Sequence, residues 1–262
     1  LMSQNILEIN NLSKYFGGLA AVSECSLKVK KGTITGIIGP NGSGKTTLFN
    51  LIAGNLKSSA GSVIFNNENI TDVPSYELFS KGLLRTFQIA HEFTNLSVLE
   101  NLMMVPGNQS GEKLVNALLK PSLVAKEESQ IKEKAMEVIN FLNLSHLKNE
   151  LAGNLSGGQK KLLELGRTMM VDAKLVLLDE VGAGVNRTLL KDLGTAIEKL
   201  NKEKGYTFCM IEHDMDFIGR LCDPVIVMAE GSVLFEGSVE DAKKDEKVIE
   251  SYLGRGSKLK DN

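Results

Sequence analysis

The sequence predicts an α/β fold, in which a parallel sheet is joined by an antiparallel β subdomain and an inserted helical subdomain. Short apolar runs at 175–178 and 207–211 are typical of buried parallel strands. The alternating runs 6–10 and 26–30 indicate half-buried antiparallel strands. Apolar residues at helical spacing between 131 and 142 predict the helical part. A chain of 262 residues is long enough for one large domain with a subdomain.

A glycine-rich loop follows the first apolar strand, 33–38. Its residues are Gly39, Pro40, Asn41, Gly42, Ser43, Gly44, Lys45, Thr46 and Thr47. This run fits G-x-x-x-x-G-K-[ST], the phosphate-binding loop (P-loop) of nucleoside triphosphatases. A helix is expected directly after it, because Leu48, Leu51 and Ile52 recur at helical spacing. The free N–H groups at that helix start attract phosphate oxygens. Lys45 would add a charge for the β- and γ-phosphates, and the Thr46 hydroxyl would ligate Mg²⁺. The alternative is a glycine-rich turn with a chance Lys-Thr pair.

The chain between this loop and residue 170 becomes increasingly helical. Residues 61–67 predict a strand entering a turn, and 98–102 predict a helix. A loop is expected at 106–111, followed by a short amphipathic segment at 114–119 that Pro121 ends. One face of the next helix carries Ile131, Ala135, Val138, Ile139 and Leu142. We therefore expect a mostly helical subdomain at about 90–170.

The remaining pattern returns to strands and helices in alternation. Asn186 is expected to be the N-cap of a helix whose apolar positions include Leu189 and Leu193, with Arg187 at its first position. The runs 225–228 and 232–235 predict a hairpin. A last helix is expected at about 239–253, with Val248, Ile249, Tyr252 and Leu253 directed inward. The ATP-binding-type domain would span 2–254, and 255–262 would be a polar tail.

Two carboxylates follow the apolar strand 175–178. Carboxyl ends of parallel strands form the ligand crevice of open α/β folds. Asp179 suits Mg²⁺ binding in phosphoryl transfer, and Glu180 can polarise the attacking water. The alternative interpretation is a helix N-cap beside a surface charge.

A second glycine-containing motif begins another helix. It consists of Leu155, Ser156, Gly157, Gly158 and Gln159, and Leu162, Leu165 and Met169 follow at helical spacing. Locally, Ser156 would be an N-cap and the glycines a turn. Functionally, this helix start could hold another phosphate. Two chains packed head to tail would use both helix starts on one nucleotide.

The composition argues against several kinds of partner. The net charge is −2 and the pI about 6.0, so no basic excess indicates nucleic acid. The three cysteines lack metal-ligand spacing and fit a reducing compartment, and Cys209 is expected to be a small core residue. No apolar run reaches the ~20 residues of a membrane span. A membrane role would therefore come through a partner.

Together, the P-loop, the Leu155–Gln159 motif and the Asp179-Glu180 pair resemble the ATP-binding-cassette (ABC) ATPases from Ile6 to Leu253. The resemblance implies a dimer that encloses two ATP–Mg²⁺. It implies that Phe16 stacks on adenine, that Gln88 senses Mg²⁺ and the membrane partner, and that His213 contacts the γ-phosphate. Ser156, Gly157 and Gly158 would close over ATP held by the opposite subunit.

Within that family, the chain is similar to the ATPase subunits of branched-chain amino-acid importers. The similar stretches are 85–88, 95–102, 106–128, 183–186, 211–215 and 248–254. This resemblance implies permease transmembrane subunits, a homodimer or a heterodimer with a sister ATPase, and a periplasmic or extracellular substrate-binding protein. It implies a location on the cytoplasmic face of the membrane. The first alternative is a lipopolysaccharide-export ATPase, which has a shorter segment before the Leu155–Gln159 motif. The second is a soluble non-transport ABC ATPase. Two departures from the family pattern are Val181 and Arg187, where proline is usual.

Overall fold

The computed structural model describes residues 5–86, 92–107, 109 and 121–253. The chain divides into two compact units. Unit 1 consists of residues 1–85, 174–182 and 197–262, and unit 2 of residues 86–173 and 183–196. The segment 183–196 was not assigned to the helical part from the sequence.

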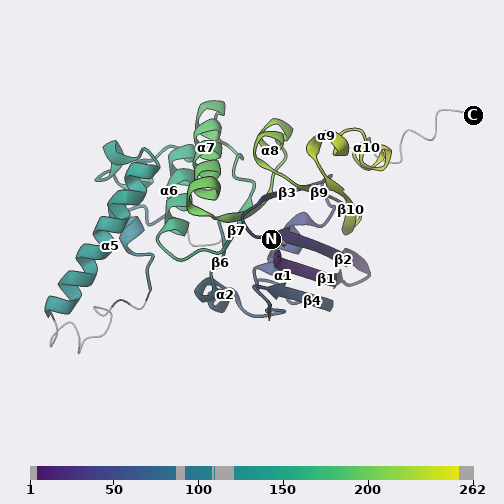
Figure 1. Cartoon of the computed structure of the whole chain (residues 1–262), viewed down its shortest axis with the longest axis horizontal. Coiled ribbons are helices and arrows are strands. Elements are labelled where there is room, and N and C mark those ends of the chain that lie inside the picture. The colour runs from purple at the N-terminus through teal and green to yellow at the C-terminus, as the bar shows by residue number, and fades with distance from the viewer. Residues whose placement is uncertain (1–4, 87–91, 108, 110–120, 254–262) are drawn as a thin grey trace, which may run out of the picture. The chain divides into compact units, whose positions relative to one another are not determined.

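The first sheet of unit 1 is antiparallel and has the strand order β2-β1-β4-β5. Its strands are β1 (Asn5–Phe16), β2 (Leu19–Lys30), β4 (Ala60–Phe65) and β5 (Glu68–Asn69). Figure 1 shows β1, β2 and β4 side by side. The prediction of antiparallel strands at 6–10 and 26–30 is confirmed, and the structure shows that the two strands pair with each other and extend to the turn at 17–18.

The second sheet of unit 1 has the order β10-β9-β3-β8-β7-β6. Its strands are β3 (Ile34–Ile38), β6 (Leu83–Arg85), β7 (Leu175–Asp179), β8 (Thr207–Ile211), β9 (Val225–Ala229) and β10 (Ser232–Gly237). The strands β9, β3, β8, β7 and β6 are parallel, whereas β10 forms the predicted hairpin with β9. The three-residue strand β6 was not predicted. The carboxyl ends of the parallel strands share one edge of this sheet.

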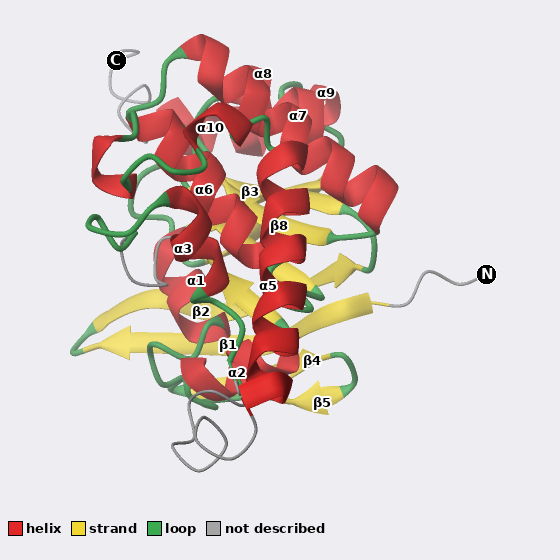
Figure 2. Ribbon diagram, turned by 90° about the vertical axis from the view of Figure 1, so that its left-hand side faces the viewer, coloured by secondary structure: helices red, strands yellow, loops and turns green. Residues whose placement is uncertain are grey.

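Helix α1 (Lys45–Ile52) belongs to the hydrophobic core that the two sheets share. That core includes Leu48, Phe49 and Ile52 of α1, Leu7 and Ile9 of β1, and Leu177, Cys209 and Met228 of the parallel strands. The other face of the parallel sheet is covered by α8 (Met215–Leu221) and α9 (Val239–Ala242) (Figure 2). Gly36 allows this approach, because a Cβ there would lie 3.1 Å from Cys222 Cβ.

The chain's last helix does not run from 239 to 253 as expected. Helix α9 ends at Ala242, and α10 (Glu246–Leu253) starts after a break at 243–245. Val248 is buried, but Ile249, Tyr252 and Leu253 are 41%, 48% and 69% exposed. The prediction that all four point inward was therefore wrong for three of them. Helix α10 has only eight residues, and Val248 is its buried one.

Unit 2 is built from helices α3 (Val98–Met103), α5 (Pro121–Phe141), α6 (Gly157–Met169) and the first part of α7 (Arg187–Lys204). The predicted apolar face is confirmed at Ala135, Val138 and Ile139 of α5 and at Leu142 directly after it, which are at most 4% exposed, whereas Ile131 is only partly buried. Pro121 is the first residue of α5, a position where its missing N–H is not needed. The predicted segment 114–119 lies outside the described residues. Unit 1 also contains a short helix, α2 (Ser75–Lys81), that was not predicted.

All three cysteines are buried thiols. Burial raises the pKa of Cys25 to about 11 and that of Cys209 to about 12, and it also raises the pKa of Cys222. The expectation that Cys209 packs in the core is confirmed. Among the described residues, no helix has the length and apolar character needed to cross a membrane.

Candidate functional site

The P-loop connects the end of β3 to the start of α1. Gly39 has φ 147°, and a Cβ there would collide with the Met228 carbonyl oxygen. Gly44 has φ 97°, and a Cβ there would collide with the Ala21 carbonyl oxygen. Both positions therefore require glycine, because the neighbouring atoms are backbone and cannot move aside.

The lysine of the loop is folded back onto the loop itself. Lys45 Nζ donates to the carbonyl oxygens of Gly39 at 2.8 Å and Pro40 at 3.0 Å. Burial lowers the pKa of Lys45, while the negative charges of Glu180 and Asp179 act in the opposite direction. Its ammonium group thus lies where phosphate oxygens could replace the two carbonyls as acceptors.

The start of α1 has no side-chain cap and no acidic residue in its first turn. Its first N–H groups are therefore available to an external acceptor, and the helix dipole favours an anion. Thr46 is exposed, Thr47 is partly exposed, and Asn41 and Gly42 are exposed. The loop is also tied to the β9–β10 turn, since Gly231 N–H donates to the Ser43 carbonyl at 3.1 Å.

Glu180 and His213 meet at the carboxyl edge of the parallel sheet. Glu180 directly follows β7, and His213 follows β8 by one residue. Their side chains are 3.2 Å apart, between Glu180 Oε1 and His213 Nε2. Glu180 has φ 49°, a left-handed conformation that is uncommon for a residue with a Cβ and indicates local backbone strain. Both side chains are about half exposed, so a water molecule can reach them.

Asp179 is held by a buried cation that the sequence patterns did not identify as part of the site. Arg85 Nη2 lies 2.5 Å from Asp179 Oδ2, and Arg85 Nη1 donates to Asn50 Oδ1 at 2.6 Å. The Arg85 side chain is only 7% exposed. Arg85 thus joins the ends of β6 and β7 to α1 and fixes the orientation of the Asp179 carboxylate.

Glu212 is a second residue of the site that the sequence patterns did not identify. It is 5% exposed, and its carboxylate accepts the Gly182 N–H at 2.6 Å and the His213 N–H at 3.2 Å. Burial raises the pKa of Glu212, and these two hydrogen bonds oppose that shift. Glu212 therefore connects the loop after Glu180 to the backbone of His213. In the sequence, only its position between the end of a buried strand and His213 indicates that Glu212 belongs to the site, and this indication is weak.

In unit 2, the Leu155–Gln159 motif begins α6 with a complete capping box. Ser156 Oγ accepts the Gln159 N–H at 3.4 Å, and Gln159 Oε1 accepts the Ser156 N–H at 2.9 Å. The local prediction that Ser156 is an N-cap is confirmed. A Cβ on Gly158 would come within 2.7 Å of Leu189 Cβ, whereas one on Gly157 would meet only Gly184 O at 3.7 Å. Gly158 thus lets α6 and the start of α7 lie in contact.

The other positions singled out from the sequence have different outcomes. Phe16 ends β1, is 48% exposed, and has Lys14 Nζ 5.3 Å from its ring centroid. Gln88 lies outside the described residues. The expected cap of α7 is confirmed, since Asn186 Oδ1 accepts the Leu189 N–H at 2.9 Å and Arg187 is the first helical residue. Val181 is 2% exposed and packs in the core.

Comparison with known proteins agrees with this geometry. Residues 22–183 match the family model for the ABC transporter. The chain is 44% identical over 95% of both chains to a probable branched-chain amino acid transport ATP-binding protein, LivG, of Archaeoglobus fulgidus. It is 35% identical to the high-affinity branched-chain amino acid transport ATP-binding protein BraF of Pseudomonas aeruginosa, over 97% of this chain and 99% of that one.

Solved structures give the same result for the fold. A nucleotide-free ATP-binding cassette from an ABC transporter has a TM-score of 0.82 at 41% identity, covering 96% of this chain and all of the other. A cassette solved in its ADP conformation has a TM-score of 0.81 at 40% identity, covering 97% of this chain and all of the other. This chain therefore belongs to the ABC transporter family, as an ATP-binding cassette that hydrolyses ATP.

Proposed function

We propose that this chain powers the import of branched-chain or related amino acids by hydrolysing Mg²⁺-bound ATP. The observation that carries the proposal is the meeting of the P-loop, Asp179 and the Glu180–His213 pair at one edge of the parallel sheet. Those are the groups that phosphoryl transfer to water requires. The substrate class rests on the relatives from Archaeoglobus fulgidus and Pseudomonas aeruginosa, whose names specify branched-chain amino acids.

Each site residue has a role in this proposal. The backbone N–H groups of Asn41–Thr47 and the Lys45 ammonium bind the phosphates, and Phe16 stacks on adenine. Glu180 takes a proton from the attacking water, and His213 holds the γ-phosphate. Gln88 acts in the same step and links it to the permease. A second copy or a sister subunit contributes Ser156, Gly157, Gly158 and Gln159 to the γ-phosphate.

The donor set fits a magnesium ion. Mg²⁺ binds one or two protein oxygens together with phosphate oxygens and water. Thr46 offers an exposed hydroxyl, and Asp179 offers a carboxylate that keeps acceptor capacity beside its bond to Arg85. When bound, the ion would neutralise developing charge on the phosphates. Arg85 would orient the Asp179 carboxylate toward the ion, and the start of α1 would position the Thr46 hydroxyl as a ligand.

Substitution of Glu180 tests the hydrolytic role. Glu180→Gln should keep ATP binding and lower kcat by about 10²–10⁴-fold, because the amide cannot accept the proton of the water. Glu230→Gln is a matched control, since Glu230 also follows a strand of this sheet and also has a positive φ, 48°. A Glu180→Gln protein that hydrolyses ATP at the wild-type rate would falsify the assignment of Glu180 as the base.

Reconstitution tests the transport role. The chain, its permease and its substrate-binding protein in vesicles should take up leucine, isoleucine or valine when ATP is supplied on the side of the ATPase. Glu180→Gln should abolish this uptake. Gln88→Ala should weaken stimulation by the permease more than basal hydrolysis. ATP-driven uptake of another substrate class, with none of these amino acids, would contradict the proposed import function while leaving the ATPase intact.

A further inference from the structure

Glu180 and His213 belong to two different loops, and their own contact is too weak to fix their separation. Glu180 follows β7, and His213 follows β8 by one residue. The last pair of the β7–β8 ladder is Asp179 with Ile211, so both residues lie beyond the paired strands. Their contact at 3.2 Å joins two half-exposed side chains, and an exposed pair of this kind contributes little free energy. The backbone therefore has to set how far apart the two side chains lie.

Glu212 joins the backbones of these two loops through one carboxylate. Its Oε1 accepts the Gly182 N–H at 2.6 Å, and its Oε2 accepts the His213 N–H at 3.2 Å. Gly182 lies two residues after Glu180, and Val181 between them is 2% exposed. Glu212 itself is only 5% exposed, and hydrogen bonds to a carboxylate are strong away from water. The carboxylate thus continues the connection between β7 and β8 beyond the end of their ladder.

The backbone at Glu180 needs such a support. Its φ of 49° is a strained conformation, which persists only where the surrounding structure holds it. On one side, the Glu180 N–H donates to the Ile211 carbonyl at 2.9 Å. On the other side, the Gly182 N–H is held by Glu212. Release of the Gly182 peptide would let Glu180 relax, and its carboxylate would then move relative to His213.

We propose that Glu212 is a positioning residue for ATP hydrolysis, which fixes the separation of Glu180 and His213 and thereby sets the rate of the chemical step. This inference rests on the proposed function, in which Glu180 takes a proton from water and His213 holds the γ-phosphate. Both oxygens of the buried Glu212 already accept backbone N–H groups, so it acts through the pair and not on the substrate. Misplacement of a reacting group by about 1 Å can cost about 10²-fold in rate.

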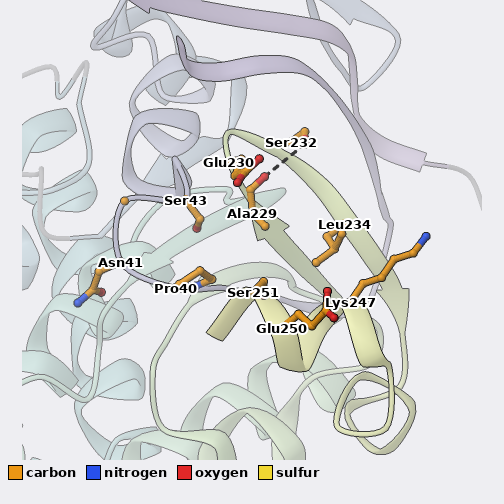
Figure 3. Close-up of a pocket in the computed structure, with 11 residues that line it drawn as sticks. Pro40, Asn41, Ser43, Ala229, Glu230, Ser232, Leu234, Lys247, Glu250 and Ser251 are labelled. Atoms are coloured by element: carbon orange, nitrogen blue, oxygen red, sulfur yellow. Dashed lines mark hydrogen bonds between the residues drawn. The ribbon is translucent and has the colours of Figure 1, made fainter. Parts of the chain in front are cut away.

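Nucleotide binding should not depend on Glu212, because the P-loop is supported from another side. Residues 40–43 of the loop line a cavity of about 550 Å³ together with the β9–β10 turn and α10 (Figure 3). Glu212 is not among the residues that line this cavity. The sheet order places β9 on one side of β3, and β8, which Glu212 directly follows, on the other. A change at Glu212 should therefore alter kcat and leave the Kd for ATP as it is.

The test replaces one carboxylate oxygen by an amide group. In Glu212→Gln, the amide oxygen can accept one N–H, but the NH₂ group cannot accept the other. The kcat for ATP hydrolysis should fall by about ten- to a hundredfold, while the Kd for ATP, measured by calorimetry, should stay at the wild-type value. Asp214→Asn is the matched control, since Asp214 Oδ1 accepts the N–H groups of Asp216 and Phe217 and asparagine is an equally good cap. It should leave both kcat and Kd unchanged.

A double-mutant cycle separates positioning from a general loss of structure. In a His213→Ala protein, adding Glu212→Gln should lower the remaining rate only slightly, because no pair is left to align. A structural defect would instead lower the rate by the same factor in both backgrounds. Single-turnover phosphate release measures these rates, and the Tm shows that each variant is folded. If Glu212→Gln does not fold, Glu212→Asp replaces it. Its shorter stem cannot hold both N–H groups, so kcat should again fall at an unchanged Kd.

The outcomes distinguish this inference from the proposed function. A wild-type kcat in Glu212→Gln, with Glu180→Gln inactive, would overturn the positioning role alone. Equal losses in the two backgrounds of the cycle would assign Glu212 to the stability of the fold. A weaker Kd at an unchanged kcat would place its effect on nucleotide binding and would also overturn the inference. Wild-type kcat values in both Glu180→Gln and His213→Ala would overturn the proposed roles of the pair, and the positioning role with them.

Discussion

Two helices of this chain begin with glycine-rich motifs, yet their first turns are built in opposite ways. Helix α1 begins after Gly44 without a side-chain cap, whereas α6 begins with a capping box formed by Ser156 and Gln159. Neither first turn contains an acidic residue. An anion is therefore compatible with both helix dipoles, but only α1 leaves its N–H groups without a local acceptor.

The N–H groups at the start of α1 can bind a phosphate directly, whereas the capping box at the start of α6 must open first. Phosphate can bind at α1 once Lys45 leaves its two carbonyl acceptors. At α6, the Ser156 hydroxyl accepts an N–H of its own helix, so contact with a phosphate competes with the cap. In the proposed dimer, α1 would therefore bind ATP before α6 of the other subunit does.

The largest expected effect comes from removing the charge at α1. Lys45→Ala should lower ATP affinity and hydrolysis by about 10²-fold or more, since a preorganised donor to the phosphates is lost. Lys160→Ala is the matched change in the first turns of α6, where Lys160 Nζ pairs with Glu92 at 2.8 Å. It should have less than a tenth of that effect on ATP binding. Equal losses for both variants, measured by calorimetry and phosphate release, would abolish the distinction between the two helix starts.

The next effect concerns the glycine that brings α6 against α7. Gly158→Ala should cost about 1–3 kcal/mol of stability, because its Cβ would overlap Leu189. Gly157→Ala should be nearly neutral, since its Cβ would make only an ordinary contact with Gly184. Thermal melts of the two proteins measure the difference. If Gly157→Ala were as destabilising as Gly158→Ala, the packing explanation would not hold.

A charge at position 156 separates capping from phosphate binding. Ser156→Asp keeps a good N-cap and should leave the Tm near the wild-type value. It should lower ATPase activity by about tenfold, because the negative carboxylate at position 156 would repel the negative γ-phosphate of the nucleotide. Ser156→Asn is the neutral control, with the same cap and no charge, and should be the more active of the two. Equal activity of the Asp and Asn variants would argue that no phosphate approaches α6.

The smallest effects are expected at the start of α7, which is also capped by a side chain. Asn186→Ala should cost about 1 kcal/mol through loss of its bond to the Leu189 N–H. Arg187→Pro should stabilise the fold by about 0.4–1 kcal/mol, because proline suits the first helical position and restricts the unfolded chain. A lower Tm for Arg187→Pro would mean that the arginine makes a specific contact. ATPase titrations of the same variant show whether a stiffer loop changes cooperativity.

Local sequence patterns were sufficient for features that are formed by neighbouring residues. The P-loop is one contiguous motif between a strand and a helix, and the buried strands β7 and β8 are uninterrupted apolar runs. The cap of α7 depends on Asn186 and a helix that follows at once. In each case, the residues that determine the structure lie within one turn or one strand, so composition and spacing predict it.

Features that depend on distant partners were missed. The strand β6 has only three residues and is defined by pairing with β7, about 90 positions later in the chain. The ion pair between Arg85 and Asp179 joins the ends of those same two strands. The break between α9 and α10 contains neither glycine nor proline, so its sequence resembles a continuous helix. Long-range pairing therefore decides β6 and the ion pair. The start of α10 is instead marked by a local cap, since Asp245 Oδ1 accepts the Val248 N–H at 3.0 Å.

The burial of all three thiols has a practical consequence for measuring how the cassette moves. Cys25, Cys209 and Cys222 are inaccessible, and their raised pKa values keep them protonated and unreactive near pH 7. A maleimide dye should therefore label only a cysteine added on the surface, without prior removal of the native ones. A variant with one added surface cysteine can then report the distance between two subunits of the proposed dimer during ATP turnover. Slow labelling of the unmodified protein would, in turn, measure how often its core opens.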